Sequence, residues 1–307
     1  MTLKKQPFIS VIIPCYNEEL YIHQALDSII NNNYSHDKLE ILVVDGLSID
    51  NTRNIVKDFI RKYDFIKLID NNKRTISYGL NLAIKYSKGD FILRADAHSE
   101  YPDDYISNCV ESMIKTDADN VGGIVSPNEK DSNNSILVKS LTTHWFGVGN
   151  STFRLNPQSK YVDTVPFGFF NKEVFKKCGF FDERLIRNQD YEFNRRILKF
   201  GGKIWLNPKI KIYYNNKTDF KGLINQAFIT GKWNVWMWRV APYSFKLSHS
   251  IPLFFLLSLL ISFFSIKSIL IIILSFYFIL SFFSSIQQSI RYSSFYYFPI
   301  LSISFFI

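Results

Sequence analysis

Residues 8–18 read FISVIIPCYNE, an apolar run followed directly by a polar cluster. The run from Phe8 to Ile13 predicts a buried strand that ends at Pro14. Apolar residues between Ile22 and Ile30 then recur at helical spacing, which predicts an amphipathic helix. This strand and helix begin the alternation that is typical of an α/β fold.

The alternation continues through the first hundred residues. Further strands are expected at 39–44, 66–69 and 90–93, with helices at 55–63 and 77–86 between them. This order predicts a Rossmann-like, mostly parallel sheet with right-handed crossovers and helices on both faces. In such a sheet, ligands bind beyond the carboxyl ends of the strands.

The pattern is less regular after residue 100, and no internal repeat is present. We expect a helix at 103–115, a strand at 121–125 and a polar loop at 127–134. A helix is expected within 182–200, where Phe193, Ile197 and Phe200 share a face, followed by a short strand at 203–206.

Composition separates a basic first part from an apolar tail. The 307 residues have a net charge of +9, with 47% hydrophobic and 21% charged residues, which excludes a disordered protein. The last sixty residues, from Ser248, contain no Asp or Glu, and their only Lys or Arg are Lys267 and Arg291. The chain is therefore expected to be a basic soluble part followed by an apolar, membrane-associated helical segment.

The tail has one stretch long enough to span a bilayer, which needs ~20 apolar residues. Residues 268–290 qualify, whereas residues 248–266 are borderline, and only Lys267 separates the two. Residues 292–307 could form a third, short segment. Two arrangements remain open, a hairpin of spanning helices or apolar helices embedded in one leaflet.

Aromatic and basic residues precede the tail and are typical of a membrane interface. They are Trp233, Trp236, Trp238, Lys232, Arg239 and Lys246. A core helix of the soluble domain is the alternative. We expect a catalytic domain at 1–219, an interfacial amphipathic segment at 220–247 and membrane-embedded helices at 248–307.

Cysteine usage and charge favour a cytoplasmic location for the soluble part. Cys15, Cys109 and Cys178 are widely spaced and form no zinc or C-x-x-C pattern, so free thiols in a reducing compartment are expected. The first ten residues contain no apolar stretch of signal-peptide length. Basic residues beside the tail also place this side in the cytoplasm.

Polar clusters at 14–18, 45–50 and 94–98 follow three of the predicted strands and should meet at one edge of the sheet. Asp45 lies at a strand end, where an unpaired carboxylate can accept a hydrogen bond from a base or a ribose. Asp50 is expected to be the N-cap of the following helix.

Two further acidic positions suggest chemistry. Asp96 and His98 can both reach one divalent cation in an extended turn, although a structural Asp-turn gives the same spacing. Asp190, beside Gln189, opens an amphipathic helix, where an acid could instead complement the helix dipole.

These motifs together resemble the family 2 glycosyltransferases, from Phe8 to Trp233. The matching strings are SVIIPCYNE (10–18), VVDGLSIDNT (43–52), GLNLA (79–83), GD (89–90), RADAH (94–98) and NQDYE (188–192). The RADAH string, PFGFF at 166–170 and the apolar tail are similar to the succinoglycan-biosynthesis subgroup. The resemblance implies the GT-A fold and a nucleoside-diphosphate sugar as donor.

The resemblance also implies roles for single residues. Those around the uridine would be Pro14, Tyr16, Glu18 and Asp45. Asp96 matches the second, metal-binding acid of the D-x-D motif and also belongs to the nucleotide site. Asp190 matches the general base.

The chain departs from the family pattern at two positions. Arg94 stands at the first acid of D-x-D, and His98 would compensate as a second ligand of Mn²⁺ or Mg²⁺, as in D-x-H enzymes. Gln189 replaces the usual Glu beside the base.

The Q-x-x-R-W element of processive relatives is matched only loosely. The residues concerned would lie on the acceptor and diphosphate side, together with Gln189. They are Gln226, Lys232 and Trp233.

The expected function is an inverting hexosyltransferase on the inner or plasma membrane, with its catalytic domain in the cytoplasm. It would move a sugar, with UDP as the expected nucleotide, to a lipid-linked or glycan acceptor in bacterial exopolysaccharide or capsule synthesis at the cell surface. A nucleic-acid partner is not expected. The alternatives are a polyprenyl-phosphate glycosyltransferase and a non-catalytic, nucleotide-binding membrane scaffold.

Overall fold

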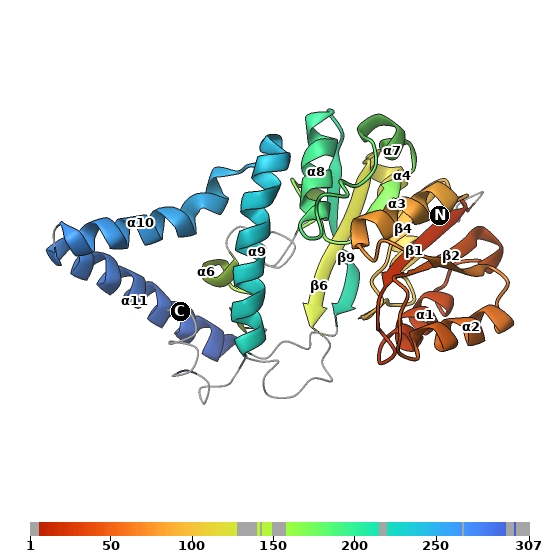
Figure 1. Cartoon of the computed structure of the whole chain (residues 1–307), viewed down its shortest axis with the longest axis horizontal. Coiled ribbons are helices and arrows are strands. Elements are labelled where there is room, and N and C mark those ends of the chain that lie inside the picture. Colours follow the sequence, from red (N-terminus) through yellow and green to blue (C-terminus); the bar gives the residue numbers. More distant parts are fainter. Residues whose placement is uncertain are drawn as a thin grey trace. The chain divides into compact units, whose positions relative to one another are not determined.

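A computed structural model describes residues 6–127, 140–141, 143–148, 158–214, 220–265, 267–292 and 298. The chain divides into two compact units, each formed from several segments. The first unit comprises Met1–Asn128, Pro157–Asn215 and Ile229–Ser244. The second comprises Glu129–Asn156, Asn216–Phe228 and Phe245–Ile307. Figure 1 shows the elements of both units.

The described part of the first unit is built on a nine-stranded sheet (Figure 1). In spatial order the strands are β3 (Ile66–Asp70), β2 (Leu39–Asp45), β1 (Ile9–Cys15), β4 (Phe91–Arg94), β8 (Phe169–Asn171), β6 (Asn120–Pro127), β9 (Ile204–Tyr214) and β5 (Ser99–Glu100), with β7 (Lys160–Tyr161) pairing with β9. Six strands point the same way, and β8, β5 and β7 run against them. The predicted mixed α/β sheet, with most strands parallel, is confirmed.

The four parallel strands β3, β2, β1 and β4 place their carboxyl ends at one edge. Cys15 pairs with Asp45, and Asp45 pairs with Asp70. On the other side of β1, Ile12 pairs with Arg94. The last residues of β1, β2 and β3 are therefore neighbours, and β4 ends beside Ile12, so the residues that follow Arg94 continue toward the same edge.

Six described helices of the first unit connect or cover these strands, and all except α7 lie near predicted positions. They are α1 (Ile22–Ile30), α2 (Thr52–Lys62), α3 (Ile76–Tyr86), α4 (Tyr105–Thr116), α7 (Glu173–Cys178) and α8 (Gln189–Lys199). In Figure 1, α1 and α2 lie on one side of β1 and β2, and α3 lies on the other. Gly79 of α3 faces Val44, since a β-carbon there would lie 3.5 Å from the Val44 side chain.

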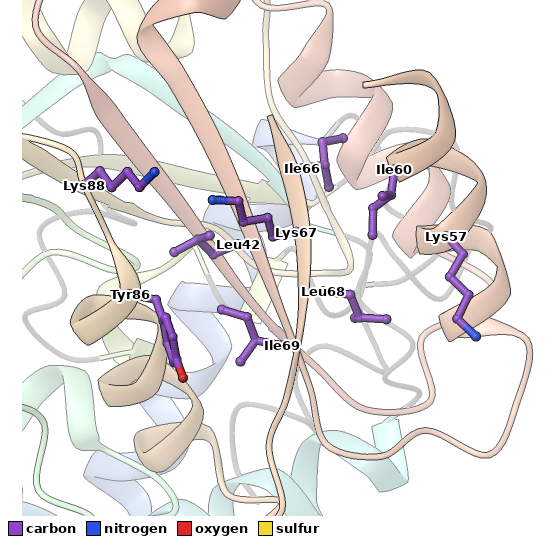
Figure 2. A pocket seen from close by; sticks show the side chains of 9 residues that line it. All are labelled: Leu42, Lys57, Ile60, Ile66, Lys67, Leu68, Ile69, Tyr86 and Lys88. Carbon is purple, nitrogen blue, oxygen red and sulfur yellow. The ribbon is translucent and has the colours of Figure 1, made fainter. Parts of the chain in front are cut away.

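Strand β3 is an edge strand of the sheet, and its residues help to line a pocket of about 580 Å³ (Figure 2). The lining residues are Leu42, Lys57, Ile60, Ile66, Lys67, Leu68, Ile69, Tyr86 and Lys88. They come from the middle of the strands and from the helices beside them. None of the residues singled out in the sequence lines this pocket.

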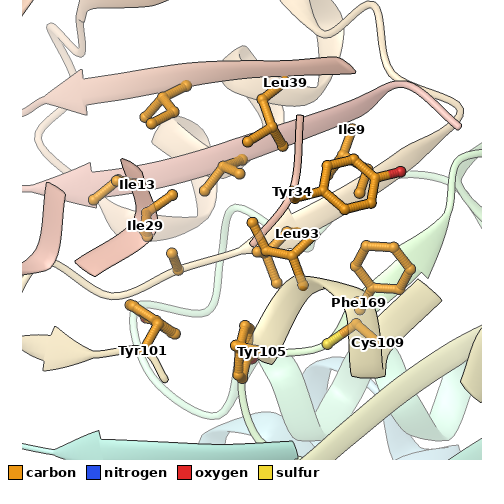
Figure 3. Close-up of a cluster of buried hydrophobic side chains, with 14 of the residues drawn as sticks. Ile9, Ile13, Ile29, Tyr34, Leu39, Leu93, Tyr101, Tyr105, Cys109 and Phe169 are labelled. Atoms are coloured by element: carbon orange, nitrogen blue, oxygen red, sulfur yellow. The ribbon is translucent and has the colours of Figure 1, made fainter. Parts of the chain in front are cut away.

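The main hydrophobic core lies between the sheet and the helices α1, α2 and α4 (Figure 3). Ile9 and Ile13 of β1 are fully buried, as are Ile29 of α1 and Cys109 of α4. Every residue of β1 except Pro14 is buried, because helices cover both faces of the sheet.

Strand β9 is longer than the sequence indicated. The predicted segment was 203–206, but the strand continues through Pro208 to Tyr214 and pairs with β6 on both sides of a register shift between Gly122 and Ile124. Proline lacks the N–H that a central strand needs, so the sequence suggested an early end. A β-carbon on Gly123 would lie 1.7 Å from the carbonyl oxygen of Ile210, so only glycine fits at this irregularity.

Helix α9 (Phe220–Val240) divides between the two units, and its second half packs on the first unit. Met237 is fully buried there, whereas Trp236 is exposed and its Nε1 donates to the carbonyl oxygen of Arg184 at 3.3 Å. After α9, the hydroxyl of Tyr243 donates to the buried carboxylate of Glu192 in α8. This segment is therefore partly packed and partly exposed.

The second unit contains the apolar tail as two helices, α10 (Ile251–Phe264) and α11 (Lys267–Arg291). Within Leu247–Phe264 and Lys267–Arg291, the most apolar 18-residue stretches have mean hydropathies of 1.9 and 2.5, and by length and composition each segment could cross a membrane. Only 11% and 17% of the residues in these 18-residue stretches are buried in the structure, unlike the core helix of a soluble protein. Most of the expected third segment and of the polar loop at 127–134 falls outside the described residues.

One face of α11 is polar near its end. Its buried side chains are Ser281, Ser284, Ser285, Gln288 and Ser289. Gln288 donates to the carbonyl oxygen of Ser140 at 2.6 Å, and Gln287 lies 3.0 Å from Nε2 of His144. Short helix α6 (Trp145–Val148) belongs to the same contact, since Phe146 packs against Tyr277.

Candidate functional site

Hydrogen bonds join the loops that follow β1 and β2. The backbone N–H of Asn17 donates to Oγ of Ser48 at 2.8 Å, and that of Ile49 donates to Oδ1 of Asn17 at 3.0 Å. The N–H of Glu18 donates to Oγ1 of Thr52 at 2.7 Å. The sequence strings at 10–18 and 43–52 thus form one structural unit.

Asp50 belongs to the same group of contacts, one residue earlier than expected for an N-cap. The N-cap position of α2 is Asn51, whose side chain makes no cap bond. Oδ1 of Asp50 accepts from the N–H of Thr52 at 3.0 Å, and Oδ2 accepts from the N–H of Glu19 at 3.1 Å. Asp50 therefore holds the start of α2 and the neighbouring loop together.

Asp45 is fully buried at the end of β2 and is not the unpaired carboxylate that the sequence suggested. Its Oδ2 lies 2.6 Å from Nη1 of Arg53 and accepts from the N–H of Ser48 at 3.0 Å. The second Nη of Arg53 pairs with Asp70 at 2.8 Å. Arg53 therefore bridges the carboxylates at two adjacent strand ends, and sequence reasoning missed it.

Pro14, Tyr16 and Glu18 lie on or beside the end of β1. Tyr16 is exposed, and its ring rests against Gly46, where an added β-carbon would lie 3.2 Å from the ring. The Cys15 thiol points to Asp45 at 3.7 Å, and burial, followed by the negative charge of Asp45, raises its pKa. Cys15 is therefore a neutral, buried thiol packed beneath the site, next to Asp45.

His98 is the centre of a second group. Its Nδ1 lies 3.2 Å from Glu18 and 3.7 Å from Asp96, and its Nε2 lies 2.7 Å from the hydroxyl of Tyr214. Burial, followed by the charges of Asp96 and Glu18, raises the pKa of Tyr214, which keeps its hydroxyl protonated as a donor. Sequence reasoning missed Tyr214 because it lies in the unexpected extension of β9.

The residues around His98 fit a divalent cation in part. Among the described residues, no three His, Cys, Asp or Glu side chains surround one position suitable for a metal ion. The Asp96 carboxylate is 19% exposed and offers the oxygen ligands that Mg²⁺ and Mn²⁺ prefer. His98 could act as a ligand only after one ring nitrogen leaves Glu18 or Tyr214.

Arg94 and Asp190 form an ion pair between Nη1 and Oδ1. The arginine side chain is 6% exposed and that of Asp190 is 31% exposed. Burial alone would lower the pKa of Arg94, but the nearby Asp190 and Asp96 carboxylates raise it, so the group stays charged. The predicted base therefore lies beside the buried guanidinium of Arg94, which also interacts electrostatically with Asp96.

The start of α8 sets the position of Asp190. Asn188 precedes the helix in the left-handed region, with φ of 61°, which Asn tolerates better than most residues. Gln189 is buried, and Phe193 and Ile197 anchor the helix in the core. The prediction that Phe200 packs with them is wrong, because Phe200 follows the last residue of the helix and is 49% exposed.

The residues expected on the acceptor side lie in different surroundings. Gln226 is exposed and belongs to the part of α9 in the second unit. Lys232 is exposed and Trp233 half-buried in the part that belongs to the first unit, whereas Gln189 is buried. Their shared role stays a prediction.

Comparison with protein families places most of the first unit in a known group. The family model described as glycosyl transferase family 2 matches residues 10–179. The chain is 32% identical over 232 residues to dolichyl N-acetyl-alpha-D-glucosaminyl phosphate 3-beta-D-2,3-diacetamido-2,3-dideoxy-beta-D-glucuronosyltransferase of Methanococcus voltae, covering 73% of this chain and 72% of that protein. It is 28% identical over 224 residues to succinoglycan biosynthesis protein ExoA of Rhizobium meliloti, covering 72% and 67%.

Solved structures show a similar fold. S. aureus TarS in complex with UDP-GlcNAc gives a TM-score of 0.56 at 19% identity, over 69% of this chain and 59% of that one. Mannosyltransferase PcManGT from Pyrobaculum calidifontis, in complex with GDP-Man and Mn²⁺, gives 0.56 at 21% identity, over 73% and 62%. The chain thus spans about 60% of the length of these two solved structures.

Proposed function

Because the chain belongs to glycosyltransferase family 2 and has the GT-A fold, we propose that it moves a sugar from a nucleoside-diphosphate sugar to a lipid-linked or glycan acceptor, with inversion. The observation that best supports this proposal is the placement of three acids. They come from three distant segments and meet at one sheet. Asp45 is the last residue of β2, Asp96 follows the end of β4, and Asp190 pairs with Arg94, the last residue of β4.

The nucleotide would lie over the ends of β1 and β2. The exposed ring of Tyr16 offers a flat apolar face for a base, and Pro14 and Glu18 flank it. Asp45 is fully buried, so it would serve the nucleotide site by holding Arg53 and Ser48 at the strand ends. UDP is the proposed nucleotide, in line with the UDP-GlcNAc complex of TarS.

Asp96 would hold a divalent cation, Mn²⁺ or Mg²⁺, with His98 as a second ligand. Such an ion offsets the negative charge that develops on the departing diphosphate. The Mn²⁺ bound in the Pyrobaculum mannosyltransferase supports this assignment. Tyr101, whose hydroxyl accepts from the N–H of Asp96 at 2.6 Å, fixes the backbone of the proposed ligand.

Asp190 would be the general base. Its carboxylate accepts the proton of the acceptor hydroxyl while that oxygen bonds to the anomeric carbon and the bond to the diphosphate breaks. The side chain is 31% exposed, so part of the carboxylate is open to an incoming hydroxyl. One base and one cation suffice for direct displacement with inversion.

The setting we propose is the cytoplasmic side of the inner or plasma membrane, in synthesis of a bacterial exopolysaccharide or capsule. The two apolar helices support membrane association, and the names of the dolichyl-phosphate and succinoglycan relatives support synthesis of a lipid-linked glycan or a polysaccharide. Residues 1–219, 220–247 and 248–307 would be the catalytic, interfacial and membrane parts. Membership of an enzyme family favours catalysis over a non-catalytic scaffold.

The test is a donor screen with the full chain in detergent or nanodiscs. Release of nucleoside diphosphate is measured for UDP-, GDP- and dTDP-sugars, with and without polyprenyl-phosphate-linked glycans. At least one donor and acceptor pair should give turnover, and no turnover with any pair would contradict the proposal.

Replacing Asp190 by Asn tests the base on the same preparation. The change keeps the shape and removes the basicity, so transfer should fall about 10²–10⁴-fold. Nucleotide affinity, measured by calorimetry, should change little, because Asp96 and the nucleotide site that Asp45 supports hold the donor. Near-normal transfer by folded Asp190→Asn protein would exclude Asp190 as the base.

A further inference from the structure

We propose that Arg94 is a positioning residue, which holds the Asp190 carboxylate in the orientation that accepts the proton. This inference rests on the proposed function of Asp190. It concerns a position where an acid would be expected from the resemblance to the family, and where this chain has the opposite charge.

The backbone of Arg94 is fixed on both sides. It is the last residue of β4, opposite Ile12 of β1, and its N–H donates to the carbonyl oxygen of Gly168 at 3.1 Å. The guanidinium lies over the ring of Phe167 at 5.5 Å. A planar group between a strand end and an aromatic ring has little freedom to turn.

Asp190, in contrast, approaches from a distant segment and lies partly in solvent. A buried guanidinium is costly unless it has a counter-charge, so the arginine attracts the carboxylate strongly. The start of α8 places the backbone of Asp190, and the arginine orients its carboxylate. The contact joins Nη1 of Arg94 to Oδ1 of Asp190 as an ion pair. Neither of these two atoms has a hydrogen-bond partner among the described residues, so the attraction that orients the carboxylate is electrostatic.

The charge at position 94 decides between attraction and repulsion. A carboxylate there would repel Asp190 at contact distance, whereas arginine attracts it. Asp96, two residues along, also acts electrostatically on Arg94. The Arg94 guanidinium thus interacts electrostatically with both Asp96 and Asp190, the two acids that the proposed reaction requires.

A competing role for Arg94 is direct contact with the donor. Its Nε is buried and has no hydrogen-bond acceptor among the residues that the structure describes. A diphosphate or sugar oxygen could accept from it. The two roles predict different kinetics, because a donor contact affects donor affinity and a positioning contact affects the proton-transfer step.

The experiment compares four full-length variants, Arg94→Met, Arg94→Lys, Asp190→Asn and the double variant Arg94→Met/Asp190→Asn. For Arg94→Met we expect kcat to fall about 10–100-fold, below the full loss of the base, with the donor KM changed less than about 3-fold. Arg94→Lys keeps the charge and should recover part of kcat. The double variant should be no slower than Asp190→Asn alone, because positioning is useless without the base.

Thermal melting and a control variant separate this effect from misfolding. Arg61→Met removes an exposed arginine that pairs only with exposed Asp58, and it should leave kcat and melting unchanged. If Arg94→Met does not fold, Arg94→Lys decides, with a lowered kcat at unchanged donor KM expected.

Two results would overturn the inference. One is a donor KM raised 10-fold or more by Arg94→Met, with losses that multiply in the double variant, which would assign Arg94 to the donor. The other is normal kcat in folded Arg94→Met. Failure of the proposed function looks different, since the unmodified chain would then give no transfer at all.

Discussion

Asp96 and His98 are only two residues apart, yet they have different partners. The N–H of Asp96 donates to Tyr101, whereas His98 contacts Glu18 and Tyr214. His98 is thus already engaged before any cation binds, and Asp96 keeps its carboxylate available. The two residues should therefore differ in how far the reaction depends on them.

Asp96→Asn should abolish turnover, and His98→Ala should weaken it or change the preference between Mn²⁺ and Mg²⁺. The reason is that Asp96 offers the hard oxygen ligand that either ion requires, whereas the imidazole is a second, softer ligand. The measurement is transfer rate against added metal after treatment with a chelator. Exposed Asp64→Asn is the control, and full activity in excess chelator would refute the metal requirement.

At single residues, the sequence predicted the acids better than their partners. Asp45, Asp96 and Asp190 stand in recognisable strings, and the strand order brings the first two to one edge. Arg53 could not be assigned, because its contacts to Asp45 and Asp70 depend on how α2 packs. Arg94 was noted as a departure, but only the fold shows that it meets Asp190.

Among the elements, α8 joins the proposed base to the segment that leads to the tail. Glu192 is fully buried and pairs with Arg196 at 2.7 Å, and Tyr243 donates to it from beyond α9. Asn188, just before the helix, donates to Asn234 of α9 at 2.7 Å. These contacts between α8 and the segment from Asn234 to Tyr243 all lie within the first unit.

Tyr243→Phe should lower the stability of the first unit by about 1–3 kcal/mol, since it takes one donor from a buried, charged acceptor. The loss should appear as a lower melting temperature with normal transfer per folded molecule. Tyr86→Phe, which removes a largely exposed phenol, is the matched control. Equal melting of both variants would show that the Tyr243 contact contributes nothing.

The longer β9 shows why some elements could not be predicted. Its continuation through Pro208 is possible because the pairing with β6 shifts register at Gly123, where only glycine fits. Local sequence patterns do not reveal such a shift. Strands β1 to β4 were predictable because their buried residues form uninterrupted apolar runs.

At the scale of the whole molecule, the chain divides into a unit with the sheet and a unit with the apolar helices. Their composition differs, and this difference was visible in the sequence. The division along the chain was less visible, because residues 129–156 and 216–228 join the second unit from the middle of the sequence.

A chain cut after Lys246 should lose most of its membrane association, because α10 and α11 are removed. The remaining tryptophan segment should bind anionic lipid only weakly. Sedimentation of membranes from cells expressing the two forms measures the difference, with the first unit's melting as the check on folding. If both forms sediment equally, the anchor lies before residue 247.

The polar face near the end of α11 limits how deep that helix can sit in a bilayer. The part between Lys267 and the first buried serine, residues 268–280, is about 20 Å long at 1.5 Å per residue, against about 30 Å for the hydrocarbon layer. A full crossing takes about 20 residues, roughly 268–287, so it would draw the buried Ser281, Ser284 and Ser285 into the hydrocarbon and leave Gln288 at its edge. Since Gln288 donates to Ser140, Ser140 would then lie at the same edge of the membrane.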